Sequence, residues 1–187
     1  MFAPATASQT VGPFFAIGMT PLYKSRLFDG PTGAGGISVR GQVFDGNGEP
    51  ISDALLELWQ ADATGRYATS AGAGFGRVPT DEAGAFCFHT VLPGRVPGPA
   101  GTWQAPHISV CVFMRGLLRP ARTRLYFPAD PSHTEDAVLA LVPAARRSTL
   151  IARAQPQSLR MDMDTEAVTV QWDVHMQGEA ETVFFEF

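Results

Sequence analysis

The chain has few of the side chains that bind metal ions or form disulfides. Its 187 residues include two cysteines, four histidines and three tyrosines. Cys87 and Cys111 both lie inside apolar strand patterns and do not form a Cys-X-X-Cys pair. Because an isolated free cysteine usually behaves as a small apolar residue, we expect two buried thiols in place of a disulfide or a metal ligand.

Long runs of positive charge and long apolar runs are also missing. Lys and Arg total 14 against 18 Asp and Glu, which gives a formal net charge of -4. Without a Lys/Arg cluster the chain lacks the surface that binds a phosphate backbone, so no nucleic acid partner is expected. No segment approaches the ~20 apolar residues that cross a bilayer, and residues 1–6 do not begin a secretion signal. We therefore expect a cytoplasmic protein with no membrane contact.

Glycine and proline, by contrast, are abundant, with 19 and 15 residues spread along the chain. No helical periodicity lasts three turns, whereas short alternating apolar segments recur between turns. The pattern predicts a single all-β domain, a β-sandwich of about eight strands with long loops and little helix. The predicted strands are residues 37–44, 53–60, 85–90, 107–115, 124–127, 159–164, 168–176 and 182–187.

Turn residues refine this prediction. Asp45-Gly46-Asn47-Gly48 is typical of a tight hairpin, so we expect residues 37–44 to pair with residues 53–60. Residues 95–106 contain three prolines and are predicted to form a surface loop. Residues 144–154 hold alanine, arginine and leucine without proline, which predicts a turn or two of helix.

The segment His107-Ile108-Ser109 has one histidine where a pair would bind a metal ion. Alternate side chains of a strand leave the same face, so a His-X-His pair can ligate one ion side by side. A neutral serine hydroxyl is a poor ligand for a transition metal by comparison. We interpret His107 as a hydrogen-bonded strand histidine. The remaining histidines, His89, His133 and His175, have no partner two or four residues away.

Several motifs in chain order resemble the intradiol ring-cleavage dioxygenases. They are Ser8-Gln9-Thr10-Val11-Gly12-Pro13-Phe14-Phe15, Gly41-Gln42-Val43-Phe44-Asp45-Gly46-Asn47-Gly48, Leu58-Trp59-Gln60-Ala61-Asp62 and Ala105-Pro106-His107-Ile108. Two more, Thr123-Arg124-Leu125-Tyr126-Phe127 and residues 178–187, resemble the alpha chain of the two-chain members of that family. The resemblance therefore spans nearly the whole chain.

The resemblance implies a hetero-oligomer with a homologous beta subunit that holds Fe(III) through two tyrosines and two histidines. The assembled enzyme would cleave protocatechuate with O2 to 3-carboxy-cis,cis-muconate in the beta-ketoadipate pathway of aromatic catabolism. In this chain Ser109 stands at one of those histidines, Val96 at one tyrosine and Gln104 at an arginine of the catalytic chain. Tyr67, the only phenol of residues 61–79, lies too early in the chain to match the other tyrosine. We expect no metal-binding and no catalytic residue here.

The same resemblance places an N-terminal segment of the alpha chain in the substrate pocket. Thr10, Gly12, Pro13 and Phe14 would shape the cleft, and Gly12 would let backbone approach a flat ring closely. Without the resemblance, these residues are typical of a rigid entry turn. We expect residues 1–36 to form an arm that contacts the partner chain, with the sandwich at residues 37–187.

Arg115 is the predicted substrate-binding cation. It ends the strand at residues 107–115, and a guanidinium is a preorganised fork for a planar carboxylate. The alternative is a solvated charge at a strand end. Arg119, Arg122 and Arg124 form a basic patch that we interpret as surface or interchain salt-bridge residues.

Two other functions remain open from the sequence. The chain is a self-sufficient dioxygenase if Tyr67, Tyr126 and His133 assemble an altered ferric site. Alternatively it is an interaction module that keeps the β-sandwich and has no part in the chemistry.

Overall fold

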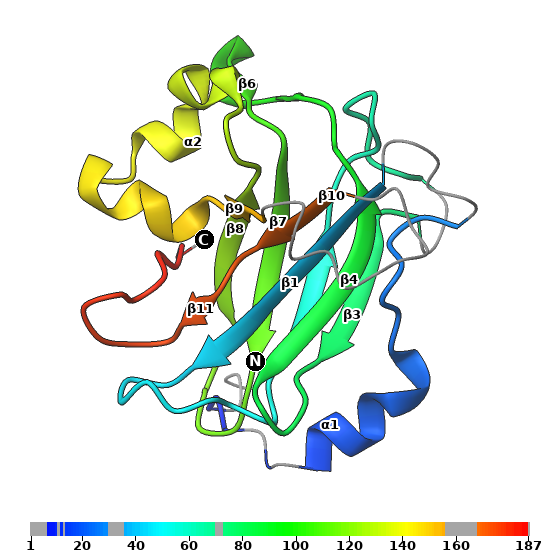
Figure 1. Cartoon of the computed structure of the whole chain (residues 1–187), viewed down its shortest axis with the longest axis vertical. Coiled ribbons are helices and arrows are strands. Elements are labelled where there is room, and N and C mark those ends of the chain that lie inside the picture. The colour runs from blue at the N-terminus through cyan, green and yellow to red at the C-terminus, as the bar shows by residue number, and fades with distance from the viewer. Residues whose placement is uncertain are drawn as a thin grey trace, which may run out of the picture.

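The computed structural model describes residues 7–10, 12, 14–29, 36–69, 73–155 and 168–186. They form a β-sandwich of two facing sheets (Figure 1). One sheet joins β1 (Gly36–Phe44), β4 (Ala85–Val91), β9 (Arg153–Ala154), β10 (Val168–Gln171) and β11 (Val174–His175). In it β1 is central, antiparallel to β4 and parallel to β10 and β11.

The second sheet is antiparallel and carries the site discussed below. Its order is β3 (Phe75–Pro79), β2 (Leu55–Trp59), β7 (His107–Phe113) and β8 (Ala121–Tyr126). A separate two-stranded ladder joins β5 (Val96–Pro97) to β6 (Trp103–Gln104) within the loop that precedes β7.

Helical segments are short and lie outside the sheets. The N-terminal pair is α1 (Phe14–Met19) and η1 (Thr20–Leu22), and η3 (Pro99–Gly101) lies between β5 and β6. Beside β8 the chain forms η4 (Pro131–Glu135), α2 (Ala137–Ala140) and η5 (Ala144–Leu150), as Figure 1 shows. No helix in the described part of the chain is both long and apolar enough to cross a bilayer.

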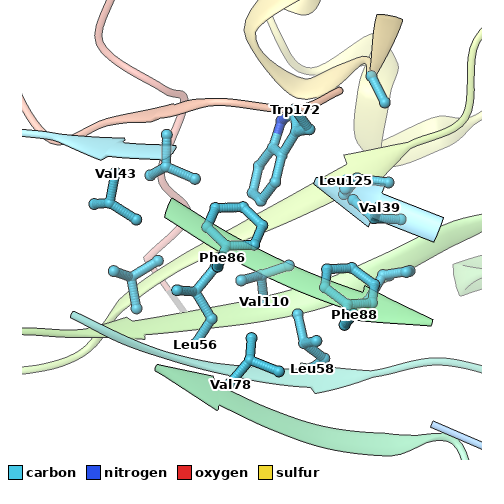
Figure 2. Close-up of a cluster of buried hydrophobic side chains, with 14 of the residues drawn as sticks. Val39, Val43, Leu56, Leu58, Val78, Phe86, Phe88, Val110, Leu125 and Trp172 are labelled. Carbon is cyan, nitrogen blue, oxygen red and sulfur yellow. The ribbon is translucent and has the colours of Figure 1, made fainter. Parts of the chain in front are cut away.

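The core lies between the two sheets, where every second residue of each strand points inward. Figure 2 shows Val39, Phe86 and Phe88 of one sheet meeting Leu56 and Leu58 of the other. Burial alternates regularly along β3 and β4. Each sheet has one apolar face. Packing the two sheets together buries both apolar faces at once and removes them from water.

The all-β prediction is confirmed. Eleven strands occur among the described residues, and four of them, β5, β6, β9 and β11, have two residues each. β3 was not predicted. It is an edge strand, where a terminal proline is tolerated, and Arg77 in it donates to Glu57 of β2, the one charge in an otherwise apolar run.

The predicted hairpin between residues 37–44 and 53–60 is wrong. The turn itself forms, since the Asp45 amide donates to the Glu49 carbonyl at 2.9 Å, and the Ile51 amide donates to Val43. The return pairing ends at Ile51, since the Val43 amide donates to Gly84 and the chain then crosses to the other sheet. β2 pairs there with β3 and β7 instead.

Two C-terminal predictions also need correction. Residues 182–186 form no strand, and the amides of Thr182 and Phe185 donate to carbonyls of two separate segments, at His175 and Arg122. The helix predicted at residues 144–154 is a 3-10 segment that ends at Leu150. The strand predicted at residues 159–164 lies outside the described residues.

Candidate functional site

The outward face of the second sheet carries the histidine motif. His107 and Ser109 of β7 lie directly opposite Tyr126 and Arg124 of β8, and Ser109 also lies opposite Trp59 of β2. Residues directly opposite in an antiparallel pair share a face, so these five side chains form one cluster. The sequence motif identified His107 and Ser109. The pairing register of β2, β7 and β8 determines the other three members of the cluster.

His107 is neutral and fixed in orientation. Its ring is buried, with 4% of the residue exposed, and Nδ1 lies 2.8 Å from the Ala105 carbonyl oxygen. Because a carbonyl only accepts, Nδ1 is the nitrogen that carries the proton, which leaves Nε2 with a lone pair. Burial, and then the nearby charge of Arg124, lower the pKa of His107 from 6.5 to about 4. The expected hydrogen-bonded strand histidine is confirmed.

Arg124 brings a positive charge into this cluster. Its Nη1 donates to Gln104 Oε1 at 2.7 Å and to the Tyr126 hydroxyl at 3.3 Å. The side chain is half-buried and does not lie on a solvated basic patch. The interpretation of Arg124 as a surface charge is therefore wrong, because β8 turns this residue toward His107 while Arg122 and Arg119 are exposed.

Two phenols border the cluster. Tyr67, which could not be aligned with a tyrosine ligand of the family, stacks on Trp59 with ring centroids 5.9 Å apart and planes 9° apart. Partial burial raises the pKa of Tyr67, and the charge of Arg124 opposes that rise. Tyr126 is fully buried, contacts His133 edge-on at 5.7 Å, and has its pKa raised to about 12 by burial. Both phenols therefore stay protonated at neutral pH.

These residues do not fit a ferric ion. A hard trivalent cation needs several anionic oxygen donors, but Val96 offers no donor, Ser109 offers a neutral hydroxyl, and the Tyr126 hydroxyl is already bonded to Arg124 and Asp136. Arg124 adds a positive charge instead. Across the described ranges, no group of three or more His, Cys, Asp or Glu residues is placed to hold a metal ion.

The predicted substrate-binding residues lie elsewhere. The Gly116 amide, in the turn after β7, donates to Thr10 Oγ1 at 3.0 Å, which joins the N-terminal segment to that turn. Arg115 is 66% exposed at its side chain, and its Nε lies 3.3 Å from Asp53 Oδ2. The structure therefore brings Thr10 and Arg115 to neighbouring positions.

Gly12 and Phe14 belong to the start of α1. The Gly12 carbonyl accepts from the Phe15 amide at 3.2 Å, and Phe14 is the first residue of the helix. Among the described residues, no atom lies within 4 Å of a Cβ added at Gly12. Contacts with that part of the chain therefore do not require glycine there. Pro13 lies outside the described residues.

The two clusters occupy opposite ends of β7 (Figure 1). β7 itself, from His107 to Phe113, spans about 20 Å, and Arg115 lies in the turn beyond its end. α1 and the N-terminal segment lie at the Arg115 end, whereas β6 and the turns around α2 lie at the His107 end. Groups this far apart cannot contact one small aromatic molecule together.

Comparison with known proteins identifies the family. The family model described as Dioxygenase matches residues 11–178. The chain belongs to the intradiol dioxygenases.

Individual members of this intradiol family show how far the likeness extends. The protocatechuate 3,4-dioxygenase alpha chain of Burkholderia cepacia is 42% identical over 200 residues, which cover 97% of this chain and 96% of that one. The beta chain from the same organism is 30% identical, covering 97% of this chain and 79% of its own length. The dioxygenase domain of a carbohydrate-binding fusion from Streptomyces sp. SirexAA-E superposes with a TM-score of 0.65 at 27% identity, covering 83% and 88%.

Sequence reasoning missed two carboxylates that organise the intradiol fold around these clusters. Asp136 is fully buried, accepts from the amides of Val138 and Leu139 at the start of α2, and accepts from the Ala105 amide at 2.7 Å. It thus ties α2 to the residue whose carbonyl orients His107. Asp53 pairs with Arg115 across the sequence. An Asp before an apolar run signals a helix cap, but its second contact is visible only in three dimensions.

Proposed function

We propose that this chain is the alpha subunit of an enzyme of the protocatechuate 3,4-dioxygenase type. It pairs with a homologous beta subunit, and the assembled enzyme cleaves protocatechuate with O2 to 3-carboxy-cis,cis-muconate. Greater similarity to an alpha chain, 42% identity against 30% for a beta chain, supports this assignment. The Fe(III) belongs to the beta subunit in this proposal.

One observation carries the proposal: in this chain, the groups that an intradiol site must bring together lie far apart. His107 and the phenols are at one end of β7, and Thr10 with Arg115 is at the other. The first group offers no ferric site, and the second has an exposed cation whose neighbour Asp53 belongs to no group of three or more His, Cys, Asp or Glu residues in the described part of the chain. The residues at the Arg115 end can therefore contribute to catalysis only beside a metal site that another chain provides.

Arg115 is the residue of this chain that binds the substrate. Asp53 contacts its Nε, which leaves the two terminal nitrogens for a second, bidentate partner. A benzoate carboxylate matches that fork in shape and charge. The side chain of Asp53 is 14% exposed, and its carboxylate forms an ion pair with Arg115 Nε without a hydrogen bond. Arg115 would orient the ring, and Asp53 would position Arg115.

The N-terminal arm shapes the rest of the cleft. Thr10 is held against the β7–β8 turn by the Gly116 amide, and α1 follows directly. Gly12, Pro13 and Phe14 then border the substrate, and the open space around Gly12 is where a flat ring or the beta chain fits. At Lys24 and Leu27 the arm is bound to this chain's own sheets, through backbone bonds to Arg77 and His89. Its partner-facing part is therefore the portion before Lys24.

Ferric iron, when held by the beta subunit, supplies the activation of the catechol ring toward O2. This chain provides geometry: a carboxylate-binding cation, a cleft wall and the exclusion of water from the reacting ring. We also propose a cytoplasmic location. Cys87 and Cys111 are both free thiols, which suits a reducing compartment.

Co-expression with a catalytic beta chain tests the proposal. We expect a stable mixed complex on gel filtration, with protocatechuate-dependent O2 uptake that the beta chain alone does not match. The isolated chain should carry no iron and show no phenolate-to-iron absorption. One tightly bound iron per isolated chain, with turnover, would instead establish the self-sufficient dioxygenase. A mixture that neither associates nor changes O2 uptake would establish the interaction module.

A further inference from the structure

The residue opposite Ser109 is a cation. In the β7–β8 ladder Ser109 pairs directly with Arg124, and directly opposed side chains leave the sheet on the same face with Cβ atoms about 5 Å apart. Ser109 is the position at which a second imidazole would complete a His-X-His pair with His107. The small serine leaves room for a guanidinium where that imidazole would bind an ion.

Arg124 is also held in place. Its Nη1 donates to Gln104 and to the Tyr126 hydroxyl, so the head group is anchored from β6 and from its own strand. Both acceptors are neutral oxygens. In the described part of the chain no carboxylate forms an ion pair with Arg124, unlike Arg77, Arg95, Arg115, Arg146 and Arg153. The buried Asp136 carboxylate reaches this group only through the Tyr126 hydroxyl, which donates to Asp136 Oδ1 at 3.4 Å, so the guanidinium lies beside His107 without a direct ion pair.

We propose that the guanidinium of Arg124 is a resident cation that takes the place of a metal ion at the His107 end of β7. It gives the neutral His107, Gln104 and Tyr126 side chains the positive charge around which an ion site is otherwise built. A site that has lost only its ligands regains metal binding when one substitution restores a ligand side chain. A fixed cation makes metal binding unfavourable even when a ligand returns, since like charges a few ångströms apart repel strongly in a half-buried site. This inference concerns the isolated chain and does not depend on pairing with a beta subunit.

Two different causes would each prevent metal binding here, the missing ligand side chains and the charge of Arg124, and substitutions can distinguish them. If missing donors alone prevent metal binding, Ser109→His restores a side-by-side imidazole pair, with the Tyr67 phenol next to Trp59 as a third donor. If Arg124 is the obstacle, that substitution alone does little, and metal binding needs the charge removed as well. Gln replaces Arg124 with a shorter, neutral side chain that retains hydrogen-bonding groups.

The test is Co(II) titration of isolated variants, followed by the visible d–d absorption of the bound ion. We expect Ser109→His to bind Co(II) no better than the wild type. The Ser109→His/Arg124→Gln variant should bind at least about tenfold more tightly than Ser109→His. A matched control is Ser109→His/Arg122→Gln, which removes a charge from the same strand and face but opposite Cys111. It should behave like Ser109→His.

A charge-retaining variant isolates the cause. Ser109→His/Arg124→Lys keeps the charge without the planar fork, and we expect it to bind as weakly as Ser109→His. Thermal unfolding of each variant checks the fold, and Ser109→Cys, which adds less volume, replaces Ser109→His if the histidine variants do not fold. The proposal is overturned if Ser109→His alone binds as tightly as the Arg124→Gln double variant. It is equally overturned if a folded Arg124→Gln double variant gains no Co(II) affinity, or if the Lys variant matches it.

Discussion

Thr10 and Gly116, which are 106 positions apart in the sequence, are joined by a hydrogen bond of 3.0 Å from the Gly116 amide to the Thr10 hydroxyl. The bond holds the N-terminal arm against the turn that follows Arg115. It places Thr10 next to the turn that contains Arg115, and both residues are assigned to the substrate cleft. Each can therefore be tested with the other left intact.

Thr10→Val removes the hydroxyl but keeps the shape of the side chain. Since a net hydrogen bond is worth about 1 kcal/mol, we expect the KM for protocatechuate in the mixed complex to rise about two- to tenfold, with little change in kcat. Thr20→Val is the matched control, because Thr20 is exposed in the same arm and bonds only to Ala16 nearby. An unchanged KM in Thr10→Val would argue against an arm held in the cleft.

Arg115→Gln should separate substrates by their carboxylate. We expect kcat/KM for protocatechuate to fall about 10- to 100-fold, since a charge-assisted pair is worth about 1.5–3 kcal/mol. The rate for catechol, which has no carboxylate, should change little. Arg119→Gln, an exposed arginine of the same turn, serves as the control. Equal losses on both substrates would show that Arg115 supports the assembly and not the carboxylate.

Asp53→Asn tests the positioning of Arg115. The carboxylate is nearly buried, and its charge holds Nε of the guanidinium. Removing that charge should loosen Arg115, so we expect a smaller rise in KM for protocatechuate than in Arg115→Gln and none for catechol. In the double variant the two effects should not add, because Asp53 acts through Arg115. Full additivity would assign Asp53 a separate role.

The stability of the fold should depend on pH through His107. Its pKa is about 4 in the folded chain against an ordinary 6.5, so the unfolded state takes up a proton first as the pH falls. The contribution is complete above pH 6.5 and declines between pH 6.5 and pH 4, by roughly 3 kcal/mol in total. Urea unfolding of the isolated chain across this range measures it. His107→Gln should flatten the slope, and an equally steep slope in that variant would assign the effect to other groups.

Asp136→Ala should be strongly destabilising. Its buried carboxylate accepts three backbone amides, from Ala105, Val138 and Leu139, and each would lose its partner. We expect a loss of about 2–4 kcal/mol in the free energy of unfolding, measured by urea denaturation. Asp130→Ala is the comparison, because Asp130 caps η4 through Ser132 alone and is only half-buried. Similar losses in both variants would show that the second tie of Asp136, to Ala105, contributes nothing.

Local pattern predicted much of the fold. The alternation at residues 37–44, 85–90 and 107–115 predicted β1, β4 and β7, although β7 ends at Phe113, because a period of two is a property of the strand itself. The turn at Asp45 also forms as predicted. What failed was pairing. β2 left its expected partner, and residues 182–186 formed no ladder, because strand partners are chosen by burial of whole faces and not by neighbouring residues.

The sequence by itself determined that this is an all-β intradiol dioxygenase chain without a His-X-His pair, since strand period and residue identity are local properties. Only the tertiary structure decided that Arg124 stands opposite Ser109 and that Thr10 meets the turn beside Arg115. Both depend on register between strands and on contacts between distant segments, which no local spacing encodes. The separation of these two clusters along β7 followed from the same packing.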